Sequence, residues 1–189
     1  MVCSSIPEPC GGDIVGIWEV TDTCFDTDPA LALSPMSEPE CQDVLTAVDM
    51  AESGAFEFRD DGTVAKKTVL SGSMSMRYTD ACIKALGGVA ADPTTCQAME
   101  NSLEENAQTD PTSPIAGGTC TLSGQACVCD ATMRPETKDE ETTYEASGTT
   151  LSFPLQGKSA GYCVSGDQLT IVAEPNSDGV RTVTTLRRS

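Results

Sequence analysis

The stretch "DIVGIWEVTDTC", residues 13–24, decides the fold prediction. It places the only tryptophan of the chain, Trp18, two residues after Gly16 in the first apolar, loosely alternating run. Residues 14–22 are also rich in β-branched side chains, and this combination predicts a first β-strand. Because buried aromatic side chains contribute much of the packing energy of a core, we expect Trp18 to fill the core rather than to contact a ligand.

Length and charge limit the class of protein. The chain has 189 residues, of which 39% are hydrophobic and 21% charged, and its formal net charge is −18. This length predicts one folded domain over residues 1–189. The acidic balance argues against nucleic acid or an anionic membrane surface as a partner. No apolar run is long enough to span a membrane.

Cysteine content gives the compartment. No CxxC pair and no histidine occur, so the usual zinc ligand patterns are missing and a disulfide framework is predicted instead. Such frameworks belong to oxidising compartments, so we expect a secreted, periplasmic or cell-surface protein. The ten predicted disulfide cysteines are Cys3, Cys10, Cys24, Cys41, Cys82, Cys96, Cys120, Cys127, Cys129 and Cys163.

The first ten residues, "MVCSSIPEPC", contain no export signal, and we expect that one has been removed. Cys3 could then carry a lipid or form half of a disulfide. Lipidation would leave nine cysteines, one of them unpaired, so the even count favours a disulfide.

The first half of the chain predicts one helix and a hairpin. Residues 37–49, "SEPECQDVLTAVD", are predicted to be helical, with Ser37 and Glu40 as a capping box. Two strands follow, residues 55–60 and 62–70, and Asp61-Gly62 is typical of the turn between them.

Residues 71–140 are predicted to form a Cys-rich, partly helical insertion. Residues 71–78 suggest a short strand, and 79–88 a brief helix that ends at Gly87. A second helix starts at Asp92, with Pro93 in its first turn. Cys82 and Cys96 would face each other across this helical pair, so a bridge between them is plausible. Residues 107–118 look like a linker and 135–143, "PETKDEETT", like an acidic connector.

The segment "TCTLSGQACVCD", residues 119–130, predicts a small hairpin with two possible registers. A four-residue loop sets Cys120 opposite Cys129, whereas a two-residue loop sets it opposite Cys127. Strand alternation places Cys127 and Cys129 on one face, so they are not expected to bond each other. One of them must reach a more distant cysteine.

The last fifty residues predict five strands separated by Gly, Ser and Asn turns. They are residues 142–147, 150–155, 160–165, 168–174 and 179–188. With the first strand and the 55–70 hairpin, the count is eight. The fold expectation is therefore mainly β, an eight-stranded antiparallel barrel with the helical, disulfide-rich insertion.

Gly16-Ile17-Trp18 in the first of eight antiparallel strands resembles the lipocalin-like barrels. In that family the Trp plugs the closed end of the barrel, and an Arg of the last strand packs across it. The resemblance implies this role for Arg181 or Arg187, and we expect Arg187 to fill it. The pieces "CGGDIVGIWEV", a CxC segment and "YCVSGDQL" also resemble Cys-rich exported proteins and lipoproteins of bacteria, mostly of unknown function. Gly16, Trp18 and Arg187 are thus predicted to close the barrel.

A catalytic site is not expected. Without histidine, Ser-His-Asp and Cys-His arrangements are excluded, and no Gly-x-Ser-x-Gly, P-loop or dinucleotide motif occurs. Asp26-Thr27-Asp28 and Asp60-Asp61-Gly62 offer oxygen ligands but do not match a calcium loop. Met74 and Met76 could offer two thioethers on one strand face, although core methionine is the commoner role. No cofactor or metal is predicted.

Two non-enzymatic functions stay open. The first is the binding of a small apolar ligand between the strands, in a cavity lined by Ala65, Val69, Leu151 and Val164. The second is a surface structural or protein-interaction module that could self-assemble. An exposed apolar patch on the insertion would favour that second function.

Overall fold

The structure is a computed structural model that describes residues 1–27, 38–176 and 179–189. The chain divides into two compact units. Unit 1 comprises Met1–Asp28, Met50–Leu70 and Glu136–Ser189, and unit 2 comprises Pro29–Asp49 and Ser71–Pro135. The predicted insertion, residues 71–140, accounts for most of unit 2, which also takes in residues 29–49.

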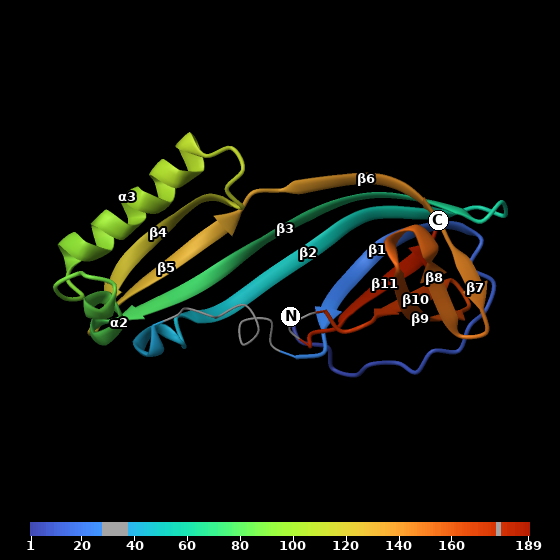
Figure 1. Ribbon diagram of the computed structural model, residues 1–189, viewed down its shortest axis with the longest axis horizontal. Helices are drawn as coiled ribbons and strands as arrows, with labels where there is room; N and C mark the ends of the chain where they lie inside the picture. The colour runs from blue at the N-terminus through green and yellow to red at the C-terminus, as the bar shows by residue number, and fades with distance from the viewer. Residues whose placement is uncertain (28–37, 177–178) are drawn as a thin grey trace. The chain divides into compact units, whose positions relative to one another are not determined.

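The chain is built mainly from antiparallel strands, as predicted, and the two α-helices of the described residues lie in unit 2 (Figure 1). The strands are β1 (Gly16–Phe25), β2 (Leu45–Phe58), β3 (Thr63–Thr79), β4 (Ile115–Ser123), β5 (Ala126–Met133), β6 (Glu136–Thr143), β7 (Glu145–Ser147), β8 (Thr150–Phe153), β9 (Lys158–Ser165), β10 (Gln168–Ala173) and β11 (Thr182–Arg188). The helices are η1 (Pro39–Cys41), α2 (Asp80–Ala85), α3 (Pro93–Thr109) and η2 (Pro154–Gln156).

The predicted closed eight-stranded barrel is wrong. Across the described residues the sheet is open and has 11 strands, in the order β4-β5-β3-β2-β1-β11-β10-β9-β8-β7, with β6 paired to β3. The reason is strand length: β2 has 14 residues and β3 has 17, so both continue into unit 2, where β3 also pairs with β5. The segment 136–147 pairs with β3 through β6 and with β8 through β7, and Tyr144 alone separates these two strands.

The predicted helix at residues 37–49 is also wrong. Ser37, its expected cap, lies outside the described residues, and only η1 is helical there before β2 begins at Leu45. Val44 and Val48 are both buried, and a spacing of four fits the two-residue period of a strand as well as a helical turn. Pairing with β3 decides between the two, and the Arg77 amide donates to the Val44 carbonyl at 2.6 Å.

Several local predictions are confirmed. The β2–β3 turn contains Gly62 with a φ of +81°, a conformation that favours glycine. The Asp92 carboxylate caps α3 by accepting from the Thr95 amide at 2.7 Å. All five C-terminal strands form. The acidic connector predicted at 135–143 is instead mostly strand β6, Glu136–Thr143, because its backbone pairs with β3.

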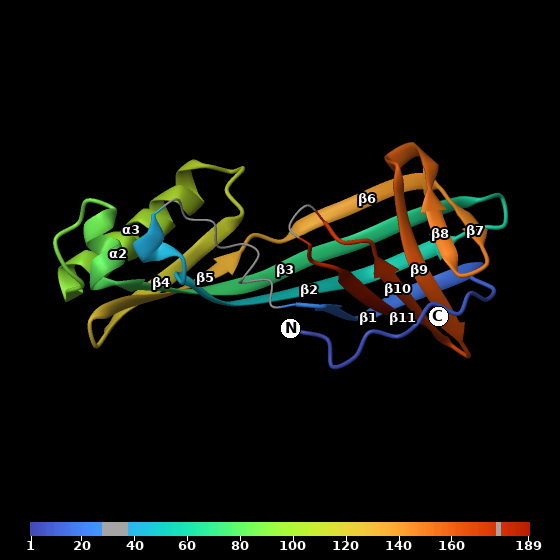
Figure 2. The same ribbon diagram turned by 60° about the horizontal axis from the view of Figure 1, so that its bottom comes forward.

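Figure 2 shows the strands β1, β2, β3 and β8 to β11 of unit 1. The core of this unit is a cluster of large side chains from these strands, together with Ile14 and Tyr144, which lie next to strands. The face of the sheet that carries this cluster is called the inner face below. Its buried members are Ile14, Trp18, Phe58, Val64, Tyr144, Leu151, Tyr162, Leu169 and Leu186.

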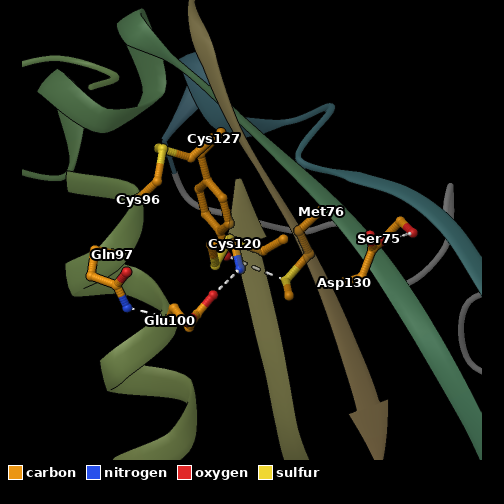
Figure 3. The surroundings of a disulfide bond; sticks show 10 residues. Ser75, Met76, Cys96, Gln97, Glu100, Cys120, Cys127 and Asp130 are labelled. Atoms are coloured by element: carbon orange, nitrogen blue, oxygen red, sulfur yellow. Dashed lines mark hydrogen bonds between the residues drawn. A yellow bond between two sulfur atoms is a disulfide. The ribbon is translucent and has the colours of Figure 1, made fainter. Parts of the chain in front are cut away.

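Unit 2 has a core in which disulfides replace large side chains, since six of its ten buried members are cysteines. Helix α3 packs against β4 and β5. The Cys96–Cys127 bridge joins the helix to β5, and the Glu100 carboxylate accepts a hydrogen bond from the Cys120 amide at 2.8 Å (Figure 3). That amide therefore points away from β5, which makes Cys120 and Cys129 a non-hydrogen-bonded pair whose side chains lie close enough to bond.

All ten cysteines form disulfides, and each bridge lies within one unit. Cys120 bonds Cys129, which corresponds to one of the two hairpin registers left open, and Cys127 bonds the more distant Cys96.

The suggested Cys82–Cys96 bridge is wrong, because Cys82 bonds Cys41. Cys3 bonds Cys24, so its sulfur carries no lipid in this structure. The remaining bridge joins Cys10 to Cys163.

Candidate functional site

Trp18 belongs to the core of unit 1. Its side chain is fully buried, and its Nε1 donates to the Ile14 carbonyl at 2.7 Å. The Arg188 guanidinium lies 4.5 Å from the centre of the indole ring and donates to the Asp13 carbonyl. Gly16 has a φ of +140°, which a residue with a side chain rarely adopts.

Arg188, rather than the predicted Arg187, is the arginine on Trp18. Strand alternation explains the difference, because Leu186 faces the core and Arg188 shares its side of β11. Arg187 points to the opposite face and pairs with Asp167 at 2.8 Å, which lowers the pKa of Asp167. Arg181 lies 3.9 Å from the carboxylate of Asp26.

Away from Trp18, the inner face becomes polar along β2 and β3. Val64 belongs to the core, and alternation places Lys66 and Thr68 on the same side of β3. Phe56 packs against the core from β2, and Glu52 reaches Lys66 from the same strand. The polar side chains of Glu52, Lys66 and Thr68 thus lie next to the apolar core, on the same face of the sheet.

Lys66 is the centre of this polar region. Its Nζ lies 2.6 Å from the Glu52 carboxylate and 5.0 Å from the centre of the Phe56 ring. The Lys66 side chain is 27% exposed and that of Glu52 is 11% exposed. A half-buried ion pair loses much of its hydration, and its Coulomb attraction offsets that cost only in part.

Thr68 adds a second polar group that packing alone does not explain. The residue is 1% exposed, and its Oγ1 has no hydrogen-bond partner among the described residues. A Cβ atom at Gly54 would lie 2.8 Å from the Thr68 Cα, so the β2 backbone lies close to that of β3 at this point. An unpaired buried hydroxyl costs about 1–3 kcal/mol. Thr23 Oγ1, on β1, is buried without a partner as well.

Strand β6 completes the region. Glu140 lies directly opposite Lys66, and Lys138 lies opposite Thr68. Lys138 is 3.9 Å from Glu136, two residues along the same face. We call this region the inner polar cluster; its residues are Glu52, Phe56, Lys66, Thr68, Lys138 and Glu140.

We expect Thr68→Val to raise the free energy of unfolding by about 1 kcal/mol, because valine keeps the shape and removes the unpaired hydroxyl. Urea unfolding followed by circular dichroism measures this change. Thr63→Val is the matched control on the same strand: the Thr63 Oγ1 donates to the Asp61 carboxylate at 2.6 Å, so the control should lose stability. A loss of stability in both variants would show that the Thr68 hydroxyl has a partner.

The residues expected to line an apolar cavity are not brought together. Leu151 is fully buried in the core and Val164 packs against it. Ala65 and Val69 alternate with Val64 and Thr68, so they lie on the opposite face of β3. The sequence did not single out Glu52, Lys66 or Thr68, although the parity of Lys66 and Thr68 with Val64 along one strand was a usable signal.

The candidate metal ligands take structural positions. Asp28 lies outside the described residues. Asp61 accepts from the amide and hydroxyl of Thr63, which lowers the pKa of Asp61 and fixes the β2–β3 turn. Met74 and Met76 pack with the unit 2 core. Within the described ranges, no group of three or more Asp, Glu or Cys side chains could hold a metal ion.

No helix in the described part of the chain is both long and apolar enough to cross a membrane.

An open surface depression is lined by Thr21, Asp167, Gln168, Leu186 and Arg187. Its polar rim consists largely of the exposed Arg187–Asp167 ion pair, whose side chains are more than half exposed. Because this ion pair is exposed, the depression is a weak candidate. We place the candidate site at the inner polar cluster, where a partly buried ion pair and a buried hydroxyl lie beside the apolar core.

Comparison with known proteins gives no match: no protein-family model, no curated protein and no solved structure matches this chain.

Proposed function

We propose that this protein is a non-enzymatic, exported binding protein that holds one small ligand at the inner polar cluster of unit 1. The observation that carries the proposal is the Lys66–Glu52 ion pair, on the same face as an apolar core and beside the Thr68 hydroxyl, which has no hydrogen-bond partner within the described ranges. Each of these groups costs stability when buried, and proteins accept such costs mainly at functional sites. Five disulfides support an oxidising compartment.

The ligand suggested by this cluster differs from the purely apolar one expected from the sequence. Trp18, Phe58 and Leu186 already fill the apolar end of the core. A ligand at the inner polar cluster would meet an ammonium, a carboxylate and a hydroxyl beside the Phe56 ring. These groups favour a short apolar body with a polar head group.

Native mass spectrometry of the purified protein tests the proposal. We expect an additional mass of a few hundred daltons, the size of a ligand that such a site can hold, and its loss on denaturation. Denaturation without reductant should leave a mass about 10 Da below that of the reduced chain, since each of five disulfides removes two hydrogens.

A pair of double variants makes the test specific to the site. Glu52→Gln/Lys66→Gln removes both charges of the ion pair, and the variant should be recovered without the additional mass. Lys67→Gln/Asp139→Asn is the matched control: it also removes one positive and one negative charge, and these two residues lie opposite each other on the outer side of β3 and β6. A control that loses the mass together with the site variant, or a wild-type protein without any, contradicts the proposal.

The second candidate function is a protein-interaction module, and exposed apolar side chains in unit 2 favour it. Val89 is 82% exposed, Leu86 51% and Leu122 41%. Light scattering after size-exclusion chromatography tests self-assembly. A mass that rises with concentration and falls in a Val89→Ser variant would support this function.

A further inference from the structure

The head group of the ligand can be inferred from the charges on the inner face, if the proposed function holds. Two ammonium groups and three carboxylates share this face of β2, β3 and β6: Lys66 and Lys138 with Glu52, Glu136 and Glu140. Each lysine already has a carboxylate partner, Glu52 for Lys66 and Glu136 for Lys138. One carboxylate, Glu140, has no ion-pair partner among the described residues.

We infer that the ligand at the inner polar cluster carries a positively charged head group, an ammonium, which binds the carboxylate of Glu140. An ammonium donates up to three hydrogen bonds, and bonds from a charged donor to a carboxylate are about twice as strong as neutral ones. The Thr68 hydroxyl oxygen is a second acceptor, since it has no partner among the described residues. Thr68 lies on the inner face two residues along β3 from Lys66, the residue directly opposite Glu140 on β6.

The surroundings of Lys66 show that this face accommodates an ammonium. Lys66 Nζ lies 5.0 Å from the centre of the Phe56 ring, which is the geometry of a cation–π contact. The net charge of −18 also raises the local concentration of cations around the protein. An anionic head group would have to displace Glu52 or Glu136 from its lysine and would stand opposite the unpaired Glu140.

Isothermal titration with three probes of equal chain length tests the inference: octylammonium, octanol and octanoate, each below the concentration at which it forms micelles. We expect one octylammonium per protein, bound at least about tenfold more tightly than octanol, the difference that one charge-assisted contact supplies. Octanoate should bind more weakly than octanol.

The variants locate the charge. Glu140→Gln should lower the octylammonium affinity about five- to tenfold and leave octanol binding unchanged. Asp139→Asn removes the same charge one residue away on the outer face, so it should leave both affinities within about twofold of the wild type.

The outcomes separate this inference from the proposed function. If octanol and octanoate bind and octylammonium binds no better, the positive head group is wrong and ligand binding at the cluster stands. If Asp139→Asn weakens binding as much as Glu140→Gln, the attraction is that of the whole protein and the assignment to Glu140 is overturned. If none of the three probes binds, both the inference and the binding proposal fail.

Discussion

Replacing Trp18 with alanine is expected to lower the free energy of unfolding of unit 1 by about 3–5 kcal/mol, the usual cost of removing a fully buried large aromatic side chain. The indole fills the core and donates to the Ile14 carbonyl, and Arg188 covers its ring. The alanine variant loses all three interactions. Urea unfolding followed by far-ultraviolet circular dichroism measures the change.

Trp18→Phe keeps the fold testable if the alanine variant does not fold. Phenylalanine retains most of the buried area but cannot donate to Ile14, so it should cost less than alanine does. Arg188→Met isolates the guanidinium, and a contact with an aromatic face contributes about 0.5–2 kcal/mol. A Trp18→Ala variant within about 1 kcal/mol of the wild type would contradict the buried position of this side chain.

The Cys10–Cys163 bridge is expected to contribute more stability than the Cys120–Cys129 bridge. The two bridges close segments with sequence separations of 153 and 9 residues. In the chain-entropy description, removing the long-range bridge by Cys10→Ala/Cys163→Ala costs about 4–5 kcal/mol, whereas Cys120→Ala/Cys129→Ala costs about 2–3 kcal/mol. Chemical unfolding of the two double variants, with the other bridges oxidised, measures the difference.

The order of these two effects is the informative result. Cys129 is 1% exposed in the unit 2 core, so its replacement also leaves a small cavity. A short-range bridge that proves the more costly to remove would mean that packing within the unit 2 core outweighs loop closure. The expected order would mean that Cys10–Cys163 acts mainly by restricting the unfolded chain.

Local chemistry was readable from the sequence where one or a few neighbouring residues control the structure. Gly62 permits the left-handed turn between β2 and β3, and Asp92 caps α3 through the Thr95 amide. Cysteine count and spacing predicted complete oxidation, which the structure has. The turn and the cap depend on interactions within a few residues, so no distant partner is needed to predict them. Oxidation follows from the number of cysteines, although their pairing joins distant residues.

Predictions failed where a distant strand made the choice. Residues 44–48 fit a helix or a strand equally well until β3 pairs with them, and the acidic residues 136–143 form a strand only because β3 extends beside them. Arg187 and Arg188 differ in role because the register of β11 sets which of them faces Trp18.

The candidate site shows the same division. The sequence by itself determined a β-rich, fully disulfide-bonded, acidic chain with one tryptophan in its core, because composition, alternation and turn residues are local properties. Only the tertiary structure placed Glu52 against Lys66 and left the Thr68 hydroxyl without a hydrogen-bond partner in the part of the chain that the structure describes. The physical reason is that the energy of a buried charge or hydroxyl depends on which groups the fold brings within hydrogen-bond distance, and strand register between distant segments sets those neighbours.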